Sequence, residues 1–180
     1  RCFFYHKINH VSAFALSAHN LSRPKKLISP IFKLLDFYID EFIIDTSKYK
    51  YNIRFIGNFD IFSKETINKL THINNLNKHS KTLIIALNYS GSEDIKHAAT
   101  LLKNNKNKNI HFSDLLSTSQ YPNPDLLIRT GGYQRLSDFF LFQMNFTELF
   151  FLNTLWPNLK NKSVDSIVAK YSKIVRKFGK

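Results

Sequence analysis

Apolar residues along the chain occur either in short continuous runs or in longer stretches where they recur every three or four residues. The short runs predict strands and span Val11–Leu16, Ile53–Ile56, Leu83–Leu87 and Leu126–Ile128. The longer stretches between them predict amphipathic helices. Because strands and helices alternate, the sequence predicts an α/β fold with a largely parallel sheet flanked by helices.

The first long helix is predicted to begin at Ser29, downstream of Arg23 and Pro24. Serine can accept a hydrogen bond from the free N–H groups of a first helical turn, and Pro30 suits the first helical position. Counting from there, one face of the helix is expected to enter the core: Ile31, Leu34, Leu35, Tyr38 and Phe42.

Three later helices are predicted from similar signals. Ser63 and Glu65 are expected to begin one of them, and Glu93–Lys103 is expected to form another. The last helix is expected over Val164–Phe178, with an apolar stripe of Ile167, Tyr171, Ile174 and Phe178.

The run Leu83–Leu87 is entirely apolar and is flanked by turn residues, which is typical of a central strand buried on both faces. In open α/β sheets, ligands bind outside the carboxyl ends of the strands. The loops that start at Ser17, Asn88 and Arg129 each follow a predicted strand, so we expect them along one rim of the sheet.

Length and composition favour a single domain over residues 1–180. Hydrophobic residues make up 43% of the chain and aromatic residues 14%, which is enough apolar surface to exclude a disordered chain. The lone cysteine, Cys2, cannot form an internal disulfide and favours a reducing compartment, the cytoplasm. No apolar run reaches the roughly 18 residues of a membrane-spanning helix. The first residue is Arg1 and not Met, so we expect the start to be truncated.

The chain is strongly basic, with 26 lysines and arginines against 13 acidic residues and a formal net charge of +13. Such a charge attracts nucleic acid, anionic lipid or phosphorylated small molecules. The lysines and asparagines of Lys103–Asn109 are typical of a solvated loop. A nucleic-acid binder would carry aromatic residues on an exposed platform, whereas here most lie in apolar runs, so no nucleic-acid partner is expected.

The most informative polar segment follows the strand predicted at Leu126–Ile128 and contains Arg129, Gly131-Gly132, Arg135 and Ser137. The guanidinium group of arginine offers paired N–H donors that match phosphate oxygens, and glycines let backbone N–H groups approach an anion closely. The segment therefore indicates a diphosphate-binding site. Spacing alone leaves an alternative open, in which the glycines form only a tight turn and the arginines are surface charges.

Longer motifs cover the same region from Asp125 to Pro157: Ile-Arg-Thr-Gly-Gly, Gln-Arg-Leu-Ser-Asp-Phe, Gln143, Glu148-Leu and Leu155-Trp-Pro157. Together they closely resemble the C-terminal signature of the cis-prenyltransferases. Three earlier stretches and the end of the chain keep the order of that family: Ser17–Pro24, Ile53–Gly57, Ile85–Tyr89 and Arg176–Gly179. The resemblance implies an undecaprenyl diphosphate synthase-like fold.

The resemblance also implies an isoprenyl transferase that joins isopentenyl diphosphate to an allylic diphosphate, such as farnesyl diphosphate, and leaves a cis double bond. It implies Mg²⁺ as the cofactor and a homodimer as the assembly. Arg129, Arg135 and Ser137 match the family positions that hold the diphosphate of isopentenyl diphosphate, and Glu148 matches the acidic residue of the magnesium site. A lipid product favours peripheral contact with a membrane surface.

Asn20 and Arg23 match a catalytic loop of the family that positions the diphosphates and the proton lost from isopentenyl diphosphate, and Ser17 begins that loop. Neither an amide nor a guanidinium is a good base at neutral pH, so substrate diphosphate is expected to accept the proton. Without the resemblance, these side chains would be interpreted as ordinary loop residues ahead of a helix.

The sequence departs from the family at several positions. An Asp-Gly-Asn-x-Arg-Trp segment and a Gly-His motif are absent, so the first strand and the phosphate loop are expected to be missing. Usual family residues are replaced at five further places, by His19, Leu21, Leu27, Ser92 and Tyr133. Two alternatives to an active enzyme therefore stay open: a non-catalytic partner subunit and an inactive remnant.

Overall fold

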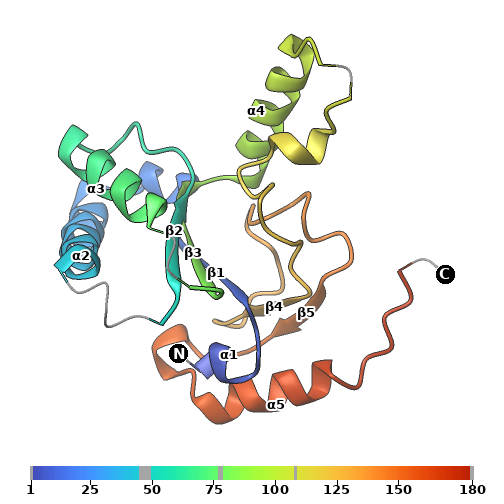
Figure 1. Ribbon diagram of the computed structural model, residues 1–180. Helices are drawn as coiled ribbons and strands as arrows, with labels where there is room; N and C mark the ends of the chain where they lie inside the picture. The colour runs from blue at the N-terminus through green and yellow to red at the C-terminus, as the bar shows by residue number, and fades with distance from the viewer. Residues whose placement is uncertain (1, 45–49, 77–78, 108, 179–180) are drawn as a thin grey trace. The chain divides into compact units, whose positions relative to one another are not determined.

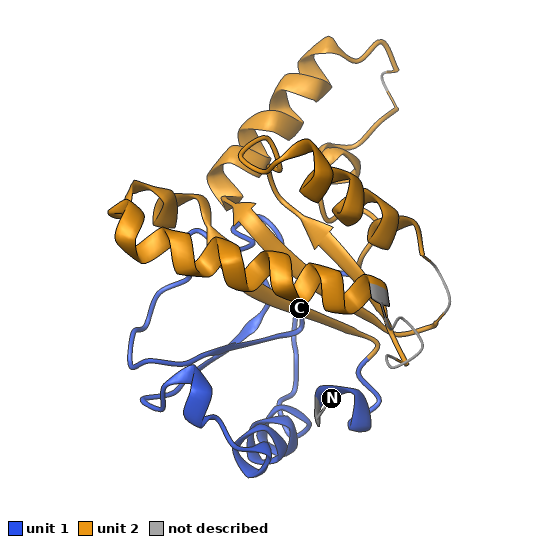
Figure 2. Ribbon diagram, turned by 90° about the vertical axis from the view of Figure 1, so that its left-hand side faces the viewer, with its two compact units in different colours: residues 1–8, 122–180 blue, residues 9–121 orange. Residues whose placement is uncertain are grey.

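The computed structural model describes residues 2–44, 50–76, 79–107 and 109–178 (Figure 1). Lys108 of the lysine-rich loop and Gly179 of the closing motif lie outside these ranges. The chain forms two compact units, one made of Asn9–Tyr121 and the other of Arg1–Ile8 with Pro122–Lys180 (Figure 2).

The unit Asn9–Tyr121 is built on a sheet of three parallel strands: β1 (His10–Ser17), β2 (Asn52–Ile56) and β3 (Thr82–Tyr89). The strand order is β1-β3-β2, which confirms Leu83–Leu87 as part of the central strand. Parallel pairing brings the ends of β1 and β3 together, with Ser17 opposite Tyr89. The loops that start at Ser17 and Asn88 therefore leave the same edge of this sheet, as predicted.

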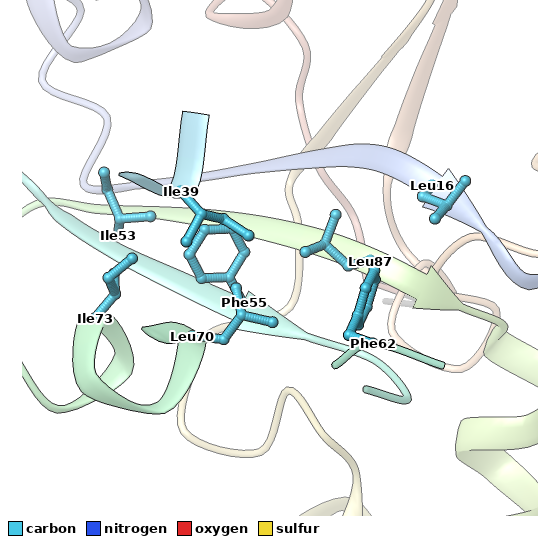
Figure 3. Close-up of a cluster of buried hydrophobic side chains, with 8 residues drawn as sticks. All are labelled: Leu16, Ile39, Ile53, Phe55, Phe62, Leu70, Ile73 and Leu87. Carbon is cyan, nitrogen blue, oxygen red and sulfur yellow. The ribbon is translucent and has the colours of Figure 1, made fainter. Parts of the chain in front are cut away.

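Two helices, α2 (Lys25–Ile44) and α3 (Lys64–Asn75), cover one face of this sheet. Apolar side chains of the two helices, of the strands and of the turn before α3 meet in one buried cluster (Figure 3): Leu16, Ile39, Ile53, Phe55, Phe62, Leu70, Ile73 and Leu87. Burying a side chain of this size contributes roughly 1.5–3 kcal/mol relative to leaving it in water. The cluster therefore holds the two helices against the sheet that carries Ser17 and Asn88.

The predicted start of α2 at Ser29 is wrong, because the helix begins at Lys25 and Pro30 lies inside it. The first turn forms directly after Pro24, whose carbonyl oxygen accepts a hydrogen bond from the N–H of Leu27 at 2.8 Å. Ile28, in the first turn of this helix, is buried. Pro30 costs this helix one backbone hydrogen bond, a loss that the buried face offsets.

The core-facing side of α2 agrees with the prediction in part, because Ile31, Leu35 and Phe42 pack against the buried cluster. Leu34 and Tyr38 were expected in the core, yet they are 55% and 49% exposed. The buried side is centred on Ile28, Leu35 and Ile39, which recur at helical spacing. The predicted face was therefore too wide on one side, where Leu34 and Tyr38 face solvent.

The starts of the next two helices agree with the sequence. Ser63 caps α3, and its hydroxyl accepts a hydrogen bond from the N–H of Thr66 at 3.1 Å. Helix α4 (Gly91–Asn104) follows β3 and is capped by Ser90, so it contains the predicted Glu93–Lys103 helix. A short 3-10 turn, η3 (Phe112–Leu115), comes after the lysine-rich loop.

The other unit pairs two short parallel strands, β4 (Leu126–Arg129) and β5 (Glu148–Phe151), and contains helices α1 (Cys2–Tyr5) and α5 (Asn161–Tyr171) and a 3-10 turn, η4 (Trp156–Asn158). His6 at the end of α1 contacts Asp165 of α5, with Nε2 2.8 Å from Oδ1. Helix α5 begins three residues before its predicted start. Across the described residues, no helix is both long and apolar enough to cross a membrane.

The predicted end of the last helix at Phe178 is wrong, because α5 ends at Tyr171. The buried residues of this helix are Val164 and Ile167, so its apolar stripe stops earlier than the sequence pattern. Beyond the helix, Phe178 adopts a positive φ of 41°, which no helix contains. Ile174 and Phe178 therefore belong to an extended C-terminal segment.

Candidate functional site

The loop after β4 begins with Gly131 and Gly132, whose φ angles are +90° and +78°. Glycine reaches this region without the steric cost that other residues meet. Their N–H groups donate to the carbonyl oxygens of Thr154 and Leu152, each at 2.9 Å, and so prolong the β4–β5 pairing. These two N–H groups therefore serve the pairing of the strands and are not available to an anion.

Arg129 organises the rest of this loop. Its Nη1 donates to the carbonyl oxygen of Arg135 at 2.7 Å and to the hydroxyl oxygen of Ser137 at 2.8 Å. Ser137 and Asp138 both have positive φ, 54° and 64°, a conformation that costs free energy in residues other than glycine. The two hydrogen bonds from Arg129 stabilise this strained turn and bring three predicted site residues together.

The charges of the loop are concentrated at the two arginines. Arg135 lies over the ring of Tyr133, with 4.2 Å between its Cζ and the ring centroid, and the Cζ of Arg129 lies 6.0 Å from the same centroid. Burial, and then the charge of Arg135, lower the pKa of Arg129, but a guanidinium stays charged at neutral pH. Within the described part of the chain, Arg129 Nε is a buried donor without an acceptor. The cluster can therefore bind an anion.

Glu148 begins β5, where its N–H donates to the carbonyl oxygen of Asp125 at 3.0 Å and its Cα pairs with Leu126. The side chain is half-buried, and its carboxylate contacts no hydrogen-bond or ion-pair partner in the ranges that the structure describes. No three His, Cys, Asp or Glu side chains among these residues form a metal-binding group. A single free carboxylate fits Mg²⁺ that takes its other ligands from substrate phosphate and water.

The predicted residues Ser17, Asn20 and Arg23 lie at the carboxyl end of β1, in the unit Asn9–Tyr121. The N–H of Ser17 donates to Oδ1 of Asn20 at 3.1 Å, and the N–H of His19 donates to the Ser17 hydroxyl at 3.2 Å. These bonds close a 3-10 turn, η1 (Ala18–Ser22), and leave the Arg23 side chain exposed beyond it. The predicted rim shared with Arg129 stays a prediction, because Arg129 belongs to the other unit.

One functional contact escaped the sequence analysis. Arg176, in the extended C-terminal segment, forms an ion pair with Asp125, the residue immediately before β4. The same guanidinium donates to the carbonyl oxygen of Phe146 at 3.0 Å and lies over the ring of Phe178, 4.4 Å from its centroid. The ion pair raises the pKa of Arg176. Two charged residues separated by 50 others gave no local signal for this contact.

Replacing Arg176 with Met should detach the C-terminal segment from β4 and lower the stability of this unit. Trypsin should then cleave after Lys173 and Lys177 faster than in the wild-type chain. Asp125→Asn should have a smaller effect, since Arg176 keeps its contact with the Phe146 carbonyl. Equal cleavage rates in the wild type and R176M would contradict this role for Arg176.

The sequence matches the undecaprenyl diphosphate synthase family over residues 1–179. The chain belongs to this family. Members of this family are prenyltransferases, and so is this chain. The resemblance to the cis-prenyltransferases that the motifs indicated is therefore confirmed.

Two curated relatives are similar to this synthase-family chain over most of its length. An isoprenyl transferase from Aquifex pyrophilus is 36% identical over 178 residues, which cover 96% of this chain and 77% of the relative. A ditrans,polycis-undecaprenyl-diphosphate synthase ((2E,6E)-farnesyl-diphosphate specific) from Acinetobacter baylyi is 36% identical over 181 residues, 94% of this chain and 73% of the relative. Both names describe enzymes, which does not favour a non-catalytic subunit or an inactive remnant.

Solved structures agree with the synthase family assignment. The crystal structure of a "probable undecaprenyl diphosphate synthase" from Campylobacter jejuni superposes with a TM-score of 0.89 at 29% identity, covering 99% of this chain and 87% of that one. Lavandulyl diphosphate synthase from Lavandula x intermedia, in complex with dimethylallyl diphosphate, gives a TM-score of 0.83 at 27% identity, covering 97% of this chain and 80% of that one. The predicted α/β fold of the synthase type is therefore confirmed.

Proposed function

We propose that the chain condenses isopentenyl diphosphate with an allylic diphosphate, such as farnesyl diphosphate, and extends a cis-polyprenyl diphosphate by one unit. The allylic C–O bond breaks, a C–C bond forms with the double bond of isopentenyl diphosphate, and one proton leaves. Inorganic diphosphate is the leaving group. The cluster of Arg129, Arg135 and Ser137 is the observation that carries this proposal.

The two arginines suit the diphosphate of isopentenyl diphosphate. Arg129 uses Nη1 for the loop, which leaves its Nη2 to donate to a phosphate oxygen. Arg135 is exposed and adds a second fork, and the Ser137 hydroxyl can donate its proton to a third oxygen. These residues orient the substrate and neutralise its charge, which lowers the barrier without a covalent step.

Glu148 is the residue that we propose for Mg²⁺, because its half-buried carboxylate is free of partners among the described residues. When bound, Mg²⁺ would neutralise diphosphate charge as the allylic C–O bond breaks. Glu148 itself supplies a negative oxygen at the start of β5, two residues beyond the Phe146 carbonyl that Arg176 holds. A carboxylate and phosphate oxygens are the ligands that Mg²⁺ prefers.

Ser17, Asn20 and Arg23 are the residues that we propose for positioning the diphosphates and the departing proton. Asn20 uses its amide oxygen to accept from the N–H of Ser17, so its amide NH₂ is left to donate to a ligand. The Arg23 guanidinium is exposed and charged. Because both side chains are donors, the proton passes to a diphosphate oxygen of the substrate and not to the protein.

The assembly and location follow from the same proposal. We propose one family domain over residues 1–180, supported by the family match, and a homodimer as the working form. The product is a long hydrocarbon chain on a diphosphate, so the enzyme would work in the cytoplasm at a membrane surface. The lone cysteine fits this compartment.

The decisive experiment follows labelled isopentenyl diphosphate onto farnesyl diphosphate with the purified chain, first with Mg²⁺ and then with a chelator. A butanol-extractable product that appears only with Mg²⁺ is the expected result. Glu148→Gln should reduce the initial rate by about 100-fold, since a neutral amide binds a hard cation poorly. Product formation that persists in excess chelator would refute the metal assignment, and no product under any condition would refute the function.

A further inference from the structure

The ring of Tyr133 lies against both arginines of the diphosphate site. The distances from its centroid to the guanidinium carbons are 4.2 Å for Arg135 and 6.0 Å for Arg129. A cation within about 6 Å of an aromatic centroid is attracted to the negative face of the ring. The tyrosine hydroxyl makes no hydrogen bond in the described ranges, so the ring makes these contacts.

The two arginines are held in different ways. Arg129 is fixed by its hydrogen bonds to the Arg135 carbonyl and the Ser137 hydroxyl. The Arg135 guanidinium has no hydrogen-bond acceptor among the residues that the structure describes, and the Tyr133 ring is its closest aromatic contact. The charge of Arg135 also acts against that of Arg129, because it lowers the pKa of Arg129. The Tyr133 ring is therefore the contact that can hold the Arg135 guanidinium in place.

We propose that Tyr133 is a positioning residue, which holds the Arg135 guanidinium beside Arg129 before the diphosphate binds. This inference rests on the proposed function, because it assigns a task to a residue of the same site. When both guanidinium groups are already in place, binding of the diphosphate costs less conformational entropy of the arginine side chains. The electrons of the ring face also offset the repulsion between two like charges.

The test compares Tyr133→Leu, which removes the ring, with Tyr133→Phe, which keeps it and removes only the hydroxyl. Tyr5→Leu is the matched control, because Tyr5 lies in the same unit and is 83% exposed. Isothermal titration with inorganic pyrophosphate should give a Kd about three- to tenfold weaker for Y133L. Y133F and Y5L should stay within about twofold of the wild type.

Two further readouts separate positioning from a general structural effect. The KM for isopentenyl diphosphate should rise in Y133L by the same factor as the Kd, while kcat stays within about twofold. In the wild-type chain, NMR signals of the Arg135 side chain should be shifted upfield by the ring current and should return to random-coil values in Y133L. Neither readout depends on a change in stability, and Tyr133 is itself 55% exposed.

Equal pyrophosphate affinity in Y133L and the wild type would overturn the inference, and so would an equal loss in Y133F. A wild-type chain that binds no pyrophosphate would overturn it as well. Failure of the proposed function has a different signature: no transfer of labelled isopentenyl diphosphate, with pyrophosphate binding that still depends on the ring.

Discussion

Arg129→Lys should lower kcat/KM for isopentenyl diphosphate by about 100-fold, and Arg129→Met by about 1,000-fold. Arg129 serves the site in two ways, since Nη1 fixes the strained Ser137 turn and the remaining edge faces no acceptor. A lysine keeps one positive charge but offers a single ammonium, which cannot make both hydrogen bonds of the loop and still present a fork to phosphate. Steady-state kinetics at fixed farnesyl diphosphate measure both values.

The pH dependence of the Arg129→Lys variant provides a second check. Burial and the charge of Arg135 lower the pKa of the group at position 129. An arginine stays protonated throughout the assay range, whereas the same lowering of the pKa would make a lysine at this position lose its proton toward the alkaline end of that range. KM should therefore rise with pH in the variant and stay flat in the wild type.

Lys162→Met is the control for loss of charge, because Lys162 lies in the same unit, on α5, and is exposed. Its kcat/KM should stay within about threefold of the wild-type value, because salt screens the long-range effect of an exposed charge outside the site. If R129M kept more than a tenth of the wild-type kcat/KM, the assignment of Arg129 would be wrong.

The parts of the fold that the sequence predicted well carry their own local signals. Leu83–Leu87 is apolar throughout, as a central strand of a parallel sheet requires, and it lies in the middle of the β1-β3-β2 sheet. Ser63 precedes its helix directly and caps it. In both cases the sequence signal and the tertiary contacts favour the same structure.

The wrong boundaries arose where tertiary contacts override a local signal. Ser29 and Pro30 form a plausible helix start, but the helix begins earlier, after Pro24, and Ile28 in its first turn is buried. At the other end of the chain, periodicity continues to Phe178, yet helix α5 stops at Tyr171. Periodicity shows which residues could share a face, and only packing decides where that face ends.

The candidate site shows the same limit. Arg129, Arg135 and Ser137 were predicted together, and the structure joins them through one guanidinium. The use of the Gly131 and Gly132 N–H groups could not be predicted, because their acceptors come from Thr154 and Leu152, at least 20 residues later. A contact between distant segments, such as the Arg176–Asp125 ion pair, has no signature within either segment.

The second large effect is expected at Gly57, which ends β2. Gly57→Ala should lower the free energy of unfolding by about 3 kcal/mol or more and the Tm by roughly 10 °C. The φ angle of Gly57 is +121°, a region that alanine rarely adopts, and an added Cβ would lie 1.9 Å from the backbone carbonyl oxygen of Leu87. Leu87 is buried in the central strand, so neither backbone can move without separating β2 from β3.

The consequence should reach the predicted ligand edge of the sheet. The next residue, Asn58, receives a hydrogen bond on its carbonyl oxygen from Nδ2 of Asn88 at 2.8 Å, and its N–H donates to the Asn88 carbonyl at 3.3 Å. Asn88 itself has a positive φ of 47°, which these bonds help to stabilise. Shifting residue 57 would therefore disturb the turn after β3, beside Ser17, and should also reduce transferase activity.

Gly131→Ala is the matched control, because its φ of +90° is also positive but no atom lies within 4 Å of the added Cβ. It should cost only the backbone strain, about 1–2 kcal/mol. The difference between the two variants, measured by chemical and thermal unfolding, isolates the overlap with the Leu87 carbonyl. If both variants lost the same stability, the close approach of β2 and β3 at Gly57 would not limit the side chain there, and only the φ angle would explain the glycine.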